Sequence, residues 1–145
     1  LGVEFRGRAS LSAWEDSVSG ARVTLALDAE PAGYGAERSA QVGAAQSTFR
    51  VGGNSPTWPT ITATPPASSQ TWTLTLDGTA FEVADVTFDG LKELVVDMGA
   101  STCRYGGALV TPTLQSDYAD LAPGTHAAKV SEGTALVEWR ERWVV

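Results

Sequence analysis

The closing stretch of the chain, Leu114–Val145 with the sequence LQSDYADLAPGTHAAKVSEGTALVEWRERWVV, decides its fold class. It contains a turn at Pro123-Gly124, a short strand, a second turn at Glu132-Gly133 and a long alternating run. One side of that run carries Ala135, Val137, Trp139 and Trp143, interrupted by Glu141, and the other carries Leu136, Glu138, Arg140 and Arg142. Alternation with a period of two predicts a half-buried antiparallel strand, which must pair with strands formed by the rest of the chain.

The clearest hairpin lies between Trp72 and Val83. Its two five-residue runs flank Asp77-Gly78, a dipeptide that favours a two-residue type I′ turn. The register that follows places Trp72 opposite Val83 and Leu74 opposite Phe81, with all four on one face. The turn and the apolar pattern agree in this segment.

A second hairpin is predicted over residues 94–105, with Gly99-Ala100 as a type II′ loop. Strand-like runs then follow one another at short spacing from Phe49 onward, and we find no convincing helix. The sequence therefore predicts an all-β chain with an antiparallel jelly-roll or galectin-like β-sandwich. In the second hairpin, Val96 is expected opposite Cys103.

The chain divides into three parts by composition. Before the sandwich, the strand-like runs Val3–Leu11 and Arg22–Asp28 flank a polar stretch, Ala13–Gly20, that we interpret as a turn region. The predicted organisation is residues 1–35 as strands of a separate unit, residues 36–47 as a linker or loop, and residues 48–145 as the β-sandwich domain.

Composition excludes several functions. A net charge of −7 and a sequence pI near 4.5 argue against nucleic acid and against an anionic membrane surface as partners. The single cysteine, Cys103, and single histidine, His126, exclude a disulfide framework and most metal sites and catalytic triads. We predict that Cys103 is a buried, inert residue and that His126 is hydrogen-bonded at a turn. No catalytic residue, cofactor or metal is predicted.

Carboxylates occur in two sequence clusters. Paired carboxylates can serve a glycosidase or bind Ca²⁺, but no D-x-D-x-D-G calcium loop is present. Turn formation and a solvated acidic surface explain these residues better. The clusters are Asp85, Asp89, Glu93 and Asp97, and Asp117 with Asp120.

Three aromatic residues are candidates for contact with a ligand or partner. Trp72 and Trp139 lie on apolar strand faces and are expected in the core. In contrast, Trp58 lies in a loop between prolines, Trp14 lies in the polar turn region, and Tyr118 lies in the closing loop. Exposed aromatic platforms serve sugar recognition in β-sandwiches, but packing or a subunit contact is the favoured use of these three.

Four motifs resemble those of the distal tail proteins of siphophages. The pattern D-x-x-x-L-x-P-G-x-(N/H) matches residues 117–126, and the W-R-x-R of the closing strand matches residues 139–142. The turn G-N-x-P-x-x-P matches residues 53–59, and L-V-V-D followed by T-C-R-Y-G-G matches residues 94–107. Together they cover the C-terminal galectin-like domain of that family. Residues 1–35, ending on D-A-E-P-x-G-Y-G, are similar to the last strands of its N-terminal ring domain.

The resemblance implies a non-enzymatic tail-tip component of a phage or prophage. It would be an adaptor that links the tail tube to the baseplate or receptor-binding apparatus. Its partners would be other tail or baseplate proteins, with a hexameric ring in the intact protein. It would lie in the virion tail and be made in the bacterial host cytoplasm. The alternative is a carbohydrate-binding module that recognises host-surface glycans, and a carboxylate-based hydrolase ranks third.

Overall fold

The structure, a computed structural model, describes residues 4–17 and 20–144. These residues form strands joined by loops, and none of them is helical, which confirms the predicted fold class. The strands are β1 (Glu4–Ser17), β2 (Gly20–Val42), β3 (Ser47–Val51), β4 (Thr60–Ala63), β5 (Trp72–Leu76), β6 (Thr79–Val83), β7 (Leu94–Asp97), β8 (Thr102–Tyr105), β9 (Ala108–Leu109), β10 (Gly124–Val130) and β11 (Ala135–Val144).

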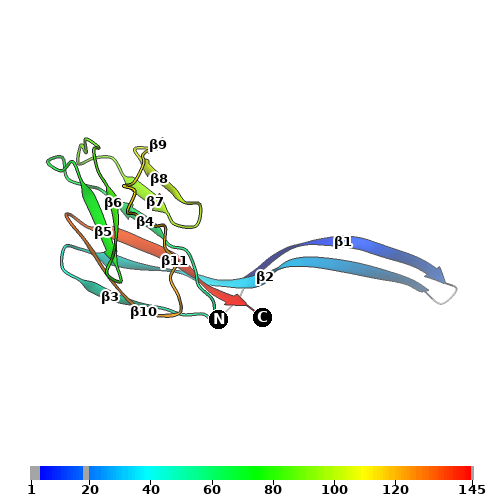
Figure 1. Ribbon diagram of the computed structural model, residues 1–145. Coiled ribbons are helices and arrows are strands. Elements are labelled where there is room, and N and C mark those ends of the chain that lie inside the picture. The colour runs from blue at the N-terminus through cyan, green and yellow to red at the C-terminus, as the bar shows by residue number, and fades with distance from the viewer. Residues whose placement is uncertain (1–3, 18–19, 145) are drawn as a thin grey trace.

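Two antiparallel sheets form the sandwich (Figure 1). The larger sheet has the strand order β1-β2-β11-β4-β7-β8-β9, and the smaller has the order β3-β10-β5-β6. Five of the nine neighbouring pairs among the described strands are not consecutive in sequence, so both sheets depend on long-range pairing. Strand β11, the closing run of the chain, lies between β2 and β4 in the larger sheet.

The core lies between the two sheets. Period-two alternation sends every second residue of most strands inward, as the burial patterns of β5, β7 and β11 show. Trp72, Leu74, Leu94 and Val137 are each at most 1% exposed. A fully buried side chain of this size contributes roughly 1.5–3 kcal/mol to folding. This alternation is what the sequence pattern predicted.

Both predicted hairpins form with the expected register. Trp72 pairs with Val83 across a turn in which Asp77 and Gly78 both have positive φ, as a type I′ turn requires. Val96 pairs with Cys103, also as predicted. However, the prediction of a type II′ loop at Gly99-Ala100 is wrong. The turn spans residues 98–101, and its positive φ falls at Ser101 rather than at Gly99.

The region before residue 48 differs from the prediction. Residues 36–42, expected in a linker or loop, belong to β2 and pair with β11. Most of these residues are small or polar and have weak strand propensity, which the pairing partner overrides. Strands β1 and β2 form one long hairpin that extends away from the sandwich (Figure 1). Trp14, expected in a turn, lies within β1 and pairs with Val23.

The turn after β3 interlocks with the end of β11. The carbonyl of Arg142 accepts hydrogen bonds from the N–H groups of Asn54 and Ser55, at 3.1 and 3.3 Å. The Asn54 side chain donates to the carbonyl of Val144 at 2.9 Å and accepts from its N–H at 2.7 Å. Gly53 has a φ of 93° beside Arg142, so no side chain fits there without strain. Two of the sequence motifs are therefore parts of one contact.

We expect Gly53→Ala to lower the free energy of unfolding by on the order of 2 kcal/mol, because its Cβ would collide with the Arg142 carbonyl at a strained φ. Gly43→Ala is the matched control, since nothing lies within 4 Å of its Cβ position and its φ is ordinary. Urea denaturation of both variants measures the effect. Equal stability of the two variants would contradict this account of the turn.

Candidate binding site

Trp58 is an exposed aromatic residue on a fixed loop. The residue is 47% exposed, whereas its neighbours Thr57 and Pro59 are buried. The backbone of Thr57 exchanges two hydrogen bonds with Leu121, at 3.0 and 2.7 Å. The loop is thus anchored on one side by the core, and the indole projects from it toward solvent.

Each of two aromatic rings in this region lies under an arginine. The guanidinium carbon of Arg142 lies 5.5 Å from the centroid of the Trp58 ring, and that of Arg140 lies 5.8 Å from the centroid of Tyr34. Such contacts hold ring and cation together. Arg142 also donates from Nη1 to Ser55 Oγ at 3.0 Å, and Arg140 donates from Nε to the Gly35 carbonyl at 3.0 Å. These bonds fix both guanidinium groups.

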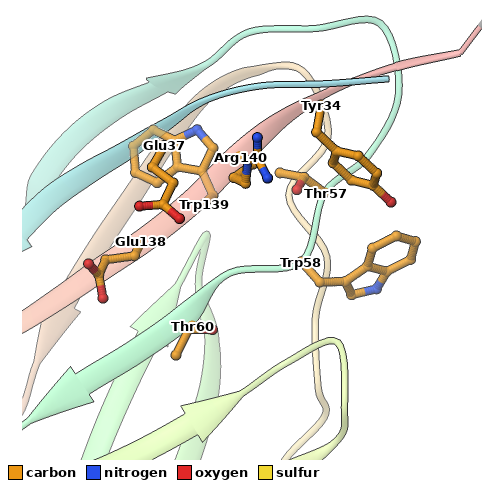
Figure 2. A pocket seen from close by; sticks show the side chains of 8 residues that line it. All are labelled: Tyr34, Glu37, Thr57, Trp58, Thr60, Glu138, Trp139 and Arg140. Atoms are coloured by element: carbon orange, nitrogen blue, oxygen red, sulfur yellow. The ribbon is translucent and has the colours of Figure 1, made fainter. Parts of the chain in front are cut away.

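Trp58 and Tyr34 border an open hollow of about 480 Å³ on the surface of the sandwich (Figure 2). That volume falls within the range of roughly 300–1,000 Å³ found for small-molecule sites. The two aromatic rings lie at one side of the hollow, and the carboxylates of Glu37 and Glu138 lie at the other (Figure 2). The lining residues are Tyr34, Glu37, Thr57, Trp58, Thr60, Glu138, Trp139 and Arg140.

Strand register explains why charged and hydroxyl side chains meet in the hollow. Glu138 of β11 pairs with Ser39 on one side and with Thr60 on the other, and Arg140 pairs with Glu37. Residues directly opposite one another in a sheet point to the same face. That face is the outer one, because the alternate residues of β11 are buried between the sheets.

A β-bulge brings Tyr34 to the same face. Tyr34 and Glu37 are three residues apart, so simple alternation would place them on opposite faces of β2. Arg140 pairs with Glu37 but Arg142 pairs with Tyr34, so two steps along β11 correspond to three along β2. An extra residue of this kind re-aims the side chains that follow it. Tyr34 therefore lies in the hollow beside Arg140.

The three predicted contact residues do not form one site in the structure. Trp58 lies in the hollow, as described. Tyr118 does not line it; its half-buried ring makes an edge-on contact with Phe81 of β6, at a centroid distance of 5.2 Å. The side chain of Trp14 lies outside the described side chains, which begin at Ala32. Trp139 is 6% exposed and belongs to the core, as predicted.

Sequence reasoning did not identify Tyr34, Glu37 or Arg140 as parts of a site. Glu37 lies in the stretch interpreted as a linker, and a linker has no partner strand. The alternating charges of β11 indicated an exposed face, but they did not indicate which residues of the neighbouring strand pair with them. Only the partner strand and its bulge bring these side chains to Trp58.

His126 is hydrogen-bonded at a turn, as predicted, and its two ring nitrogens connect two segments of the chain. Its Nδ1 lies 2.6 Å from Asp77 Oδ2, and its Nε2 lies 2.6 Å from the carbonyl oxygen of Ala122. Both partner oxygens accept hydrogen bonds, and both ring nitrogens can donate when the imidazole is positively charged. Burial opposes the charged form, but the hydrogen bonds to Asp77 and Ala122 outweigh it and raise the pKa of His126. Burial likewise opposes ionisation of Asp77, and hydrogen bonds from His126 and Ala127 lower its pKa.

Cys103 is 1% exposed, and burial raises the pKa of its thiol to about 11. A thiol in that environment is a packing residue rather than a nucleophile, as predicted. Within residues 4–17 and 20–144, no group of three or more His, Cys, Asp or Glu residues could hold a metal ion. The same residues include no helix long and apolar enough to cross a membrane.

Comparison with known proteins identifies the family. Residues 52–143 match the model of the siphovirus-type tail component, C-terminal domain. The chain belongs to this family. The match begins in the turn that contacts Arg142 and ends in β11, so it includes both halves of that interlock. It also includes Trp58 and Glu138, but Tyr34 and Glu37 precede it.

The solved structure of SPP1 Dit (gp 19.1) has the same fold as this tail component. That protein is described as a paradigm of the hub adsorption apparatus in phages that infect Gram-positive bacteria. The TM-score is 0.76 at 20% sequence identity, over 95% of this chain and 59% of that chain. This chain therefore spans less than two thirds of the length of SPP1 Dit. No match is found among curated proteins.

We predict that His126 makes the stability of the tail component depend on pH. The pKa of His126 is raised above 6.5, so its contribution is complete below pH 6.5 and is lost as the pH rises through the folded pKa. The lowered pKa of Asp77 adds a contribution that is present above pH 3.8 and is lost as the pH falls through the folded value. Urea unfolding from pH 5 to 9 gives the free energy of unfolding of the wild type and of His126→Gln. We expect the wild type to be the more stable at low pH and the difference in free energy to narrow at high pH. A difference that stays constant over this range would contradict a charged His126.

Cys103 should not react with a thiol reagent in the folded protein. At pH 8, a pKa near 11 leaves only about one thiolate in a thousand, and the sulfur is buried. Ellman's reagent should therefore detect no thiol in buffer and one per chain in guanidinium chloride. Rapid modification under native conditions would contradict the placement of Cys103 in the core.

Proposed function

We propose that this tail component is a distal tail adaptor, a non-enzymatic part that joins the tail tube to the baseplate or receptor-binding apparatus. The observation that carries the proposal is the single strand β2, which belongs to the projecting hairpin and also to the sandwich. An adaptor must transmit position between two assemblies. A continuous strand does so better than a flexible linker, which leaves its two ends free to reorient.

The two parts of the chain would make different contacts. We assign residues 1–35 to the end of an N-terminal ring domain, and residues 48–145 to a sandwich that faces outward from the ring. Residues 36–47, which include the end of β2, connect them. The ring would contain six copies in the intact protein, and the outward sandwiches would dock receptor-binding or other baseplate proteins.

Several properties of the chain support this assignment. The family is that of siphovirus-type tail components, and the fold is shared with a hub protein over 95% of this chain. Cys103 is buried with a raised thiol pKa, and His126 is held between Asp77 and the Ala122 carbonyl, so each of these two residues has a structural role. The location would be the virion tail, after synthesis in the host cytoplasm. The net charge of −7 agrees with protein partners rather than nucleic acid or membrane.

Electron microscopy of virions that carry this protein tests the proposal. Fab fragments raised against the sandwich should decorate the end of the tail distal to the capsid, because that is where the tube meets the baseplate. Fabs against the capsid protein are the matched control. Decoration along the whole tube, or on the capsid, would overturn the adaptor assignment.

A further inference from the structure

A second hollow lies beside the first on the outer face of the larger sheet. It has a volume of about 350 Å³. Leu136, on its border, pairs with Gln41 of β2 and Thr62 of β4. These pairs lie two residues along β11 from those of Glu138, so they project from the same face. The two hollows therefore follow one another along β11, and we call them together the outer groove.

The outer groove is long, and both polar and apolar side chains line it. It extends from Thr134, just before β11, to Arg140, which at about 3.3 Å per residue is roughly 20 Å. Its second half is bordered by the hydroxyls of Thr62, Thr64 and Thr134 and by the amide of Gln41. Leu136, 38% exposed, is the large apolar side chain there. The aromatic side of the first hollow lies at the other end.

We propose that the outer groove binds a neutral oligosaccharide. A sugar offers hydroxyl groups around its rim and apolar C–H groups on its faces. The exposed part of the Trp58 indole suits the C–H face, because the aromatic π-face carries partial negative charge. Carboxylates accept two hydroxyl hydrogen bonds each, and ionised acceptors make the stronger bonds. Glu37 and Glu138 are exposed and lie across the hollow from the indole (Figure 2).

Other ligand classes fit the outer groove less well. A polyanion would meet both carboxylates on a chain of net charge −7. A basic protein segment would meet Arg140, which lines the groove and already lies over the Tyr34 ring where a cation would dock. An apolar segment would leave the threonine hydroxyls and both carboxylates without partners, at a cost in desolvation.

The proposal goes beyond the adaptor function and does not depend on it, since the outer groove lies within one chain. The test is an array of neutral and acidic bacterial cell-wall and capsular oligosaccharides, probed with biotinylated protein on streptavidin. Multivalent display compensates for the weak affinity of a shallow site. The best neutral oligosaccharide is then titrated into the ¹⁵N-labelled chain.

The expected result is binding of neutral glycans that falls about tenfold in Trp58→Ala and severalfold in Glu138→Gln. Trp143→Ala and Glu93→Gln are matched controls, since both residues are exposed outside the groove. Glu138→Gln keeps shape and alters only an exposed side chain, so it remains informative should Trp58→Ala unfold.

Three results would overturn the proposal. The first is no neutral glycan above background on the multivalent array. The second is binding that Trp58→Ala and Glu138→Gln, both folded, leave unchanged. The third is salt-sensitive binding of an arginine-rich peptide to the groove in the absence of glycan binding, which would indicate a protein partner instead. Amide shifts confined to β2, β4 and β11 around the groove would support it.

Discussion

The antiparallel ladder between β2 and β11 is the interaction on which the rest of the structure depends. Nine residue pairs connect the two strands, from Ala135 opposite Val42 to Val144 opposite Ala32. At its inner end the ladder closes the core of the sandwich, since Val42 and Ala135 are both buried. At its outer end the same strand, β2, pairs with β1 in the projecting hairpin. Without this ladder, hairpin and sandwich would be separate units.

The irregularities of the ladder are as important as its regular part. The bulge in β2 moves Tyr34 to the outer face, and the Gly52–Ser55 turn holds the end of β11 beyond the core. The bulge brings Tyr34 beside Arg140, and the turn positions Arg142 over Trp58. Both aromatic rings are thus held by groups on the closing strand. The hollow therefore depends mainly on the backbone geometry that brings these side chains together.

Local patterns in the sequence predicted much of the fold and little of the site. Turn type and alternation agree within residues 72–83, so the register of that hairpin followed from the residues alone. The end of β2 consists mostly of small or polar residues, and its strand structure depends on a partner about a hundred residues later. The same separation in sequence between β2 and β11 prevented prediction of the site. Trp58 was a candidate because proline-flanked loops expose aromatics, whereas Tyr34 and Glu37 reach it only through pairing with β11 and through a bulge.

The proposed adaptor role uses the projecting hairpin, and the proposed ligand site uses the outer groove, and both belong to one sheet. This arrangement couples them mechanically. Strand β2 forms part of the hairpin and also contributes Glu37 and Gln41 to the outer groove. Twisting the hairpin about its axis must therefore turn the groove or break ladder hydrogen bonds, each worth about 1 kcal/mol net. A flexible linker would have no such coupling, because its residues reorient independently. The direction in which the groove faces is then fixed by whatever holds the hairpin, so assembly alone would orient a ligand-binding face without any contact to the face itself.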